Sequence, residues 1–273
     1  MKIKVSLFSR TLWRRYLILV SVVSVFASLF FVAVDVPDNK KLCVLAGIVL
    51  TLIGSYLALW LAANKSTSKK LNINGSPLEV KIGDIFEEDE LRVINFNEYF
   101  DTVANDTLIA KSSLNGKYLE NKVTDIATLD KSILDDSHLT EMKVGENTTR
   151  NIGKKVQYKL GSIYVADEYL LVAFSKFDKD NKAYLLMRDY INCLMTFWEE
   201  VDRVYASKSV AIPLMGAGIT RFKDANVITE QELLELLIWS FKVSRVKFRH
   251  PAKVTIVIHE SIKDKINFYE LKG

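Results

Sequence analysis

A loop after an apolar segment has the composition that phosphate binding requires. The segment Ser209–Pro213 is predicted to be a buried strand, and the loop that follows it reads Leu214, Met215, Gly216, Ala217, Gly218, Ile219 and Thr220. Because glycine has no Cβ, backbone N–H groups in such a loop can approach phosphate oxygens closely. Arg221 stands where a dinucleotide fingerprint has its third glycine, and no Gly-Lys-Ser/Thr of a P-loop follows. The pattern is compatible with a phosphate-binding loop and with a structural turn.

Two other groups of residues could carry chemistry. The segment Ser112–Lys117 also contains a glycine between predicted elements, and taken by itself it is expected to be a surface turn. Glu98 and His138 could form an acid/base pair, but no spacing brings them together. A solvated glutamate and a loop histidine are the preferred interpretation.

The residues after about 77 alternate between strand-like and helix-like segments. Two amphipathic helices are expected, over Ala183–Ala206 and from Thr229 to Lys247; Thr229 and Glu232 have the spacing of a capping box. The stretch Ala104–Thr149 is polar, and no element is assigned to it. The expected strands are Leu78–Ile82, Leu91–Phe96, Gln157–Leu160, Tyr169–Phe174, Ser209–Pro213 and Val254–Ile258. This order predicts a mixed α/β sheet with helices on both faces.

Two uncharged apolar runs precede this domain. Leu17–Val34 has 18 residues and Leu42–Asn64 has 23, so as helices they would be about 27 and 34 Å long, enough for a hydrocarbon core of about 30 Å. Pro37 lies in the seven-residue connection between them. A second apolar run follows at once and no cleavage site is evident, which argues against a signal peptide. We expect a transmembrane helical hairpin with spans at 17–34 and 42–63.

The distribution of charge and the cysteine content indicate on which side of the membrane the domains lie. Residues 1–70 carry ten basic and two acidic side chains, whereas residues 71–273 carry 27 basic and 31 acidic ones. The positive-inside rule then puts the basic N-terminus (1–16), a linker (65–76) and the domain 77–273 in the cytoplasm. A mildly acidic domain is not expected to bind nucleic acid. The two cysteines, Cys43 and Cys193, are expected to be free buried thiols.

Small residues recur along both apolar runs and allow helix backbones to approach closely in lipid. They either pack the hairpin against itself or mediate contacts between chains. The residues concerned are Ser21, Ser24 and Ser28 in the first run, and Gly47, Thr51, Gly54, Ser55, Ala58 and Ala62 in the second.

Three segments of the 77–273 region resemble the macro-domain family: Gly83-Asp84-Ile85, the strand that ends in Val93–Asn97, and the loop Ile212–Thr220. The resemblance implies a three-layer α/β/α fold that binds ADP-ribose and its derivatives. It implies that Asp84, beside Ile85, accepts a hydrogen bond from the adenine amine and that the 214–220 loop wraps the diphosphate. An earlier segment, Ser113, Leu114, Asn115, Gly116 and Lys117, would close the other side.

The match has one departure. The family's Asn-Ala-Ala-Asn stretch is replaced here by Asn95-Phe96-Asn97-Glu98-Tyr99-Phe100, so bulky residues stand where small ones admit the distal ribose in hydrolytic members. Asn95 remains a candidate ligand contact. The resemblance therefore implies ADP-ribose binding more than turnover, with no catalytic residue, metal or cofactor assigned.

A two-span hairpin before a macro domain resembles the membrane–macro effectors of Thoeris anti-phage defence. That resemblance implies a nucleotide second messenger made by a TIR-domain enzyme, with histidine conjugated to ADP-ribose in this effector class. It also implies a homo-oligomer that disrupts the lipid bilayer at the bacterial inner membrane. The alternatives are a membrane-tethered ADP-ribosyl hydrolase that uses Asn95 or Asn97, and a passive membrane-anchored scaffold.

Overall fold

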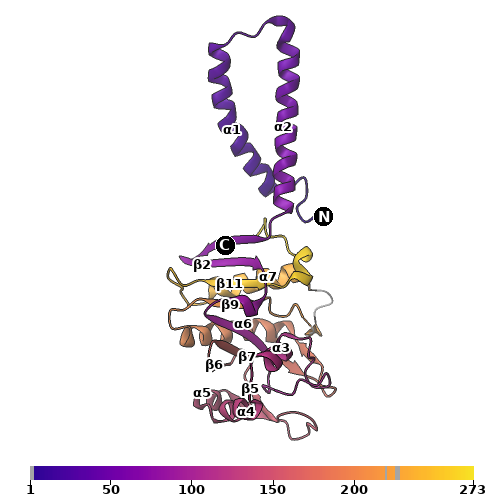
Figure 1. Cartoon of the computed structure of the whole chain (residues 1–273), viewed down its shortest axis with the longest axis vertical. Coiled ribbons are helices and arrows are strands. Elements are labelled where there is room, and N and C mark those ends of the chain that lie inside the picture. Colours follow the sequence, from indigo (N-terminus) through magenta and orange to yellow (C-terminus); the bar gives the residue numbers. More distant parts are fainter. Residues whose placement is uncertain (1–2, 219, 225–227) are drawn as a thin grey trace. The chain divides into compact units, whose positions relative to one another are not determined.

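The computed structural model describes residues 3–218, 220–224 and 228–273 (Figure 1). The chain forms two compact units. The first comprises residues 1–69 and 266–272, and the second comprises residues 70–265 with Gly273. Apart from its last residue, the chain therefore passes between the units twice, after Lys69 and after Lys265.

The first unit contains two long helices, α1 (Arg10–Ala33) and α2 (Lys41–Asn64), joined through a short 3-10 turn, η1 (Asp38–Lys40). Both are long and apolar enough to cross a membrane, and their most apolar stretches are not buried inside the unit. α1 begins before the apolar run because the Ser9 hydroxyl accepts a hydrogen bond from the N–H of Leu12 (3.4 Å) and caps the helix.

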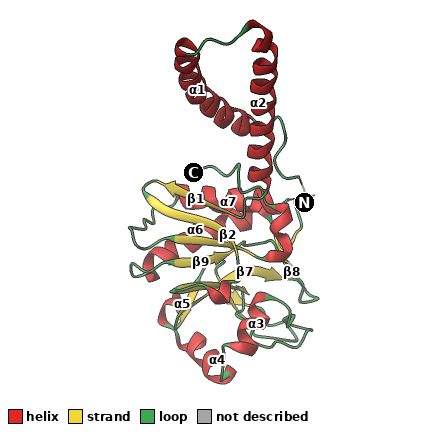
Figure 2. Cartoon of the chain, turned by 45° about the horizontal axis from the view of Figure 1, so that its top comes forward, coloured by secondary structure: helices red, strands yellow, loops and turns green. Residues whose placement is uncertain are grey.

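The two helices meet near their polar ends and diverge beyond them (Figures 1 and 2). Tyr16 donates from its hydroxyl to the carbonyl oxygen of Leu52 (2.9 Å) and packs edge-on against Tyr56, with 5.0 Å between ring centroids. Neither Gly47 nor Gly54 has a described neighbour within 4 Å of where a Cβ would stand. These two glycines of α2 therefore do not pack the hairpin against itself.

Hydrogen bonds tie three segments together at the polar end of the helices. The side-chain oxygen of Asn64 accepts from the N–H groups of Lys4 (2.7 Å) and Val5 (2.9 Å). Asn267 donates to the carbonyl oxygen of Lys4 (3.0 Å), and Ser9 donates to Glu270 (2.6 Å). The first unit is thus held by residues from both extremes of the sequence.

The second unit is built on a nine-stranded sheet. Its path is β1 (Ser68–Ile73), β2 (Ser76–Ile82), β11 (Val254–Ile258), β9 (Val210–Pro213), β3 (Leu91–Asn97), β7 (Tyr169–Phe177), β8 (Ala183–Leu185) and β10 (Arg221–Phe222), with β6 (Ile163–Ala166) also beside β7. The consecutive strands β2, β11, β9, β3 and β7 are parallel. β4 (Lys143–Glu146) and β5 (Val156–Tyr158) form a separate antiparallel pair.

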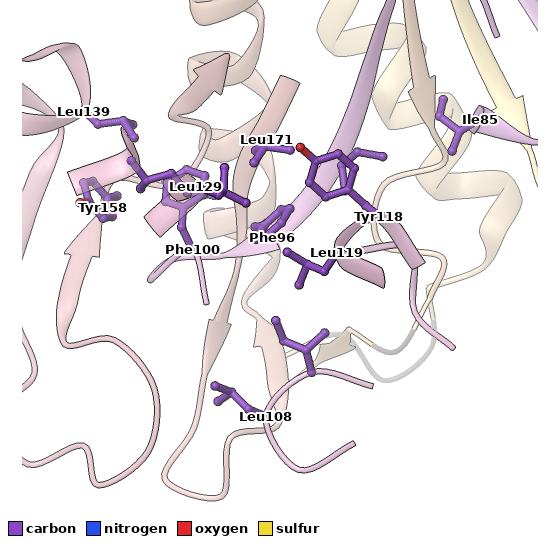
Figure 3. Packing of buried hydrophobic residues seen from close by; sticks show 14 of the residues in the cluster. Ile85, Phe96, Phe100, Leu108, Tyr118, Leu119, Leu129, Leu139, Tyr158 and Leu171 are labelled. Atoms are coloured by element: carbon purple, nitrogen blue, oxygen red, sulfur yellow. The ribbon is translucent and has the colours of Figure 1, made fainter. Parts of the chain in front are cut away.

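Helices cover both faces of this sheet, as alternate residues of β7 demonstrate. Leu171 and Ala173 belong to a core cluster shared with α3 (Leu114–Asn121), α4 (Ile126–Asp135) and α5 (Ser137–Glu141) (Figure 3). Phe174 instead packs against Tyr190 of α6 (Met187–Val204), which in turn packs on α7 (Glu230–Val243). Residues that point to opposite faces are both buried, so the domain has three layers, α/β/α.

The structure corrects several sequence expectations. Ala183–Leu185 pairs with β7 as β8, so α6 begins at Met187, and α7 ends at Val243 rather than Lys247. The expected linker 65–76 contains strand β1, and the unassigned stretch 104–149 contains α3, α4, α5 and β4. Cys193 is buried as expected, whereas Cys43, in α2, is exposed rather than buried.

Candidate ligand-binding cleft

A cleft of about 740 Å³ opens at one end of the parallel sheet. Its wall is formed where five parallel strands end: by Asp84 after β2, Asn95 of β3, Ser175 of β7, Leu214 after β9 and His259 after β11. The carboxyl ends of parallel strands meet at one edge, and ligands of open α/β sheets bind there. The volume suits a ligand of small-molecule size.

The loop after β9 forms one wall of the cleft, and its two glycines have different roles. Gly216 has φ +88°, and a Cβ there would lie 3.1 Å from the Phe222 ring, so Gly216 is required to build the turn. Gly218 has an ordinary φ and no described atom within 4 Å of a Cβ position. Leu214, Ala217 and Thr220 also line the cleft.

Met215 and Ile219 of this loop were also expected to contact the ligand. Met215 is completely buried behind the wall, and its carbonyl oxygen accepts a hydrogen bond from the Tyr190 hydroxyl (3.1 Å). Ile219 lies outside the described residues.

The segment 113–117 is the start of helix α3 and not a surface turn. The Ser113 hydroxyl accepts from the N–H of Gly116 (3.2 Å) and donates to the carbonyl oxygen of Ala110 (2.5 Å). Ser113, Leu114, Asn115 and Lys117 line the cleft. Gly116 does not line it, because it packs against the preceding backbone, where a Cβ would collide with the carbonyl oxygen of Ala110.

Gly116→Ala is therefore expected to reduce the free energy of unfolding by about 1–3 kcal/mol through overpacking. Thermal unfolding of the full chain in detergent measures this loss. Gly145→Ala is the matched control, because its nearest neighbour would be the Gln157 side chain at 3.9 Å, an ordinary contact. Equal midpoints for the two variants would contradict this role for Gly116.

Asp84 uses one carboxylate oxygen for a hydrogen bond within the protein and leaves the other available to a ligand. Its Oδ1 accepts from the N–H of Phe86 (3.0 Å) and caps the 3-10 turn η2 (Ile85–Glu87). Within the described part of the chain, Oδ2 has no donor. The Asp84 side chain is exposed, while Ile85 is buried, lines the cleft and belongs to the core cluster (Figure 3).

The two asparagines of β3 differ sharply. Asn95 lines the cleft, and its Oδ1 is buried without a hydrogen-bond partner among the described residues. Asn97 also lines the cleft, but its amide is bonded within the protein: Oδ1 accepts from the N–H groups of Tyr99 (3.0 Å) and Asp101 (3.2 Å), and Nδ2 donates one hydrogen to Asp101 Oδ2 (2.8 Å). A buried polar atom left unpaired is costly, so Asn95 Oδ1 is the natural acceptor for a ligand donor.

A buried ion pair supports the wall beside Asn97. Arg150 donates to both oxygens of Asp101, at 3.1 and 2.6 Å, and lies 4.0 Å from the centroid of the Tyr99 ring. It also donates to the side-chain oxygen of Asn181 (3.1 Å), which lines the cleft in the turn between β7 and β8. The Asp101–Arg150 pair therefore connects two walls of the cleft: β3, through Asn97, and the turn between β7 and β8, through Asn181.

Glu98 and His138 do not meet. Glu98 is buried, which raises the pKa of its carboxyl group, and it accepts from the N–H of Phe177 (3.4 Å). His138 lies in α5, with Nε2 at 2.9 Å from both carboxylate oxygens of Glu200. Both residues have structural roles, so the expectation of a solvated glutamate and a loop histidine was wrong.

Cations from three segments line the cleft: Lys117, Lys182 and Arg221. They can face a diphosphate, since lysine and arginine are the usual partners of phosphate oxygens. The sequence analysis did not predict residues 178–182 or Arg221 as part of the site. A turn between two strands, such as 178–182, has no periodic pattern that would reveal it. Within the described residues, no group of three metal-ligating side chains occurs.

Comparison with known protein families identifies the family of this chain. The family model "Thoeris protein ThsA, Macro domain" matches residues 78–259. The chain belongs to the Thoeris ThsA family. The Thoeris protein ThsA of Bacillus amyloliquefaciens (strain Y2) is 44% identical over 237 residues, which are 85% of this chain and 77% of that protein. Those 237 residues exceed the length of the 78–259 match, so similarity to ThsA extends outside the macro domain.

Solved structures of macro domains are also similar to this chain. The Oceanobacillus iheyensis macrodomain with ADP aligns with a TM-score of 0.46 and 13% identity, over 75% of this chain and 94% of that one. A mutant of the same macrodomain with ADPR aligns with a TM-score of 0.46 and 12% identity, over 75% and 95%. The ThsA macro-domain match itself runs from β2 to His259, so it includes all five strand ends that form the cleft.

Proposed function

We propose that this ThsA-family chain is a membrane effector of Thoeris anti-phage defence. Its macro domain binds an ADP-ribose derivative made by a TIR-domain enzyme, with histidine as the conjugated group. Binding promotes self-association, and the assembled hairpins disrupt the bacterial inner membrane. The observation that carries the ligand-binding step is the buried, unpaired Oδ1 of Asn95 in a cleft bordered by two phosphate-compatible segments.

Each part of an ADP-ribose ligand has a suitable partner in the cleft. The open backbone at Gly218 and the capped start of α3 at Ser113 suit the diphosphate. The spare oxygen of Asp84 suits the adenine amine, and Asn95 suits a ribose hydroxyl. The cations Lys117 and Arg221 offset the phosphate charge.

Binding without turnover is favoured by the state of the β3 asparagines. The amide of Asn97 already makes three protein hydrogen bonds, which leave only one Nδ2 hydrogen to position a water molecule or a ribose. Phe96 and Phe177, both bulky residues, are among those that line the cleft. A hydrolase remains the second candidate because Asn95 is available, and turnover of the ligand tests it.

The test uses the full chain in lipid nanodiscs, titrated calorimetrically with ADP-ribose and with its histidine conjugate. Light scattering follows the mass, and chromatography follows ligand breakdown. Binding with a rise in mass and an intact ligand supports the effector. Ligand breakdown promotes the hydrolase, and absence of binding to either compound rejects the proposed ligand class.

Asn95→Leu is expected to weaken binding by about 5- to 150-fold, the equivalent of a lost hydrogen bond of 1–3 kcal/mol. The same change should not lower the thermal midpoint, because it removes an unpaired buried oxygen. Asn97→Leu is the matched control and should lower the midpoint by breaking three hydrogen bonds. An Asn95→Leu protein that binds ADP-ribose as wild type does would remove Asn95 from the site.

The membrane steps rest on the first unit. α1 and α2 leave their apolar side chains uncovered, and the surplus of basic residues at their polar ends favours a cytoplasmic position for the N-terminus and the macro domain. Gly47 and Gly54 are open on α2, so a helix of another chain could approach there. Dye leakage from liposomes that contain the full chain, with and without ligand, tests membrane disruption directly.

A further inference from the structure

Two cations from distant parts of the sequence lie against one aromatic ring in the first unit. The guanidinium carbon of Arg15, in α1, lies 4.7 Å from the centroid of the Tyr269 ring. The Lys69 ammonium lies 5.9 Å from the same centroid and donates to the Tyr269 carbonyl oxygen (3.2 Å). Three separate segments therefore place two positive charges together.

This pair lacks a counter-charge. Among the described residues, no carboxylate lies within salt-bridge distance of Arg15 or Lys69; one oxygen of Glu270, the next residue after Tyr269, accepts from the Ser9 hydroxyl (2.6 Å). Burial and, second, the charge of Arg15 lower the pKa of Lys69, as expected when like charges approach. An anion bound between them would relieve this repulsion.

The position of the pair identifies the anion. Arg15 lies two residues before Leu17, where the uncharged apolar run of α1 begins. Trp13 and Tyr56, with 5.0 Å between ring centroids, lie at the same end of the hairpin. Tryptophan and tyrosine concentrate at the level of lipid headgroups, so a protein carboxylate is a less suitable partner at this depth than a lipid phosphate.

We propose that Arg15 and Lys69, held over Tyr269, form a binding site for the phosphate of an anionic phospholipid. Arginine can hold two phosphate oxygens at once, and lysine adds a point charge beside it. The site rests on the proposed membrane location of the hairpin but not on the ligand of the macro domain. It makes the segment 266–272 part of the lipid-facing surface.

The experiment is native mass spectrometry of the full chain in a neutral detergent, titrated with phosphatidylglycerol and, separately, with phosphatidylcholine. One phosphatidylglycerol is expected to bind more tightly than phosphatidylcholine. Arg15→Gln and Lys69→Gln should each weaken it by about fivefold, since one basic residue near the surface contributes about 1 kcal/mol. Arg15→Lys, which keeps the charge, should retain most of the preference.

Arg14→Gln and Lys70→Gln are matched controls, because each removes a neighbouring exposed charge that has no contact with the Tyr269 ring. Equal losses in all four glutamine variants would indicate a diffuse basic flank and overturn the site. Displacement of the lipid by inorganic phosphate at equal concentration would overturn the lipid assignment. Loss of the wild-type chain from carbonate-washed membranes would instead reject the membrane location, a failure distinct from that of the lipid site.

Discussion

Gly218→Val is expected to weaken the binding of ADP-ribose derivatives more than about 100-fold while leaving the thermal unfolding midpoint unchanged. The backbone at Gly218 tolerates a side chain, because its φ is ordinary and no described atom lies within 4 Å of the Cβ position. The new side chain would fill the space over which backbone N–H groups reach the phosphates. Losing two charge-assisted hydrogen bonds, at about 1.5–3 kcal/mol each, accounts for the size of the effect.

The control is Gly216→Val in the same loop. Its φ of +88° and the Phe222 ring 3.1 Å from a Cβ mean that valine there strains the fold itself. That variant should lose thermal stability as well as binding. Calorimetry and thermal unfolding on both proteins separate the two effects. A Gly218→Val protein with wild-type affinity would exclude this loop from the binding site.

Asp101→Ala is expected to reduce the free energy of unfolding by about 3–5 kcal/mol, because it leaves the Arg150 guanidinium buried without its partner. The Asp101 carboxylate is completely buried and accepts from Asn97, Arg150 and the Lys154 N–H. Thermal and denaturant unfolding measure the loss. Ligand affinity should fall as well, since Asn181 loses its fixed position when Arg150 moves.

Two comparisons make the Asp101 result specific. Glu120→Ala removes one partner of the exposed Lys111–Glu120 pair and should cost less than about 1 kcal/mol. The double change Asp101→Ala with Arg150→Met should recover part of the stability, because it removes both charges of the pair and leaves neither one buried without its partner. A double variant less stable than Asp101→Ala alone would contradict this explanation.

The sequence was sufficient for elements whose patterns do not depend on distant contacts. The apolar runs of β3, β7 and β11 predicted strands, and the Thr229–Glu232 capping box predicted the start of α7, where both of its hydrogen bonds are present. The short helices α4 and α5 were missed because they lie in a polar stretch. Helices this short are stable only because Leu129 and Leu139 are buried against the sheet.

The same distinction applies to the cleft. Asp84, Asn95 and Gly218 could be proposed because each lies in a segment that resembles the macro-domain family. Asn181 and Arg150 could not, because Arg150 pairs with a residue 49 positions earlier and Asn181 lies in a tight turn. Such pairings become visible only when the tertiary structure brings the segments together.

The double passage of the chain between its two units affects how force can be transmitted. A single flexible connection acts as a swivel: it transmits a pull but leaves rotation free. Here one connection follows Lys69, and the other leaves the cleft wall at Ser261, runs through η3 (Glu260–Lys265) and enters the first unit at Ile266. Two such connections resist twisting, so the chain can pass torque as well as tension between its two units.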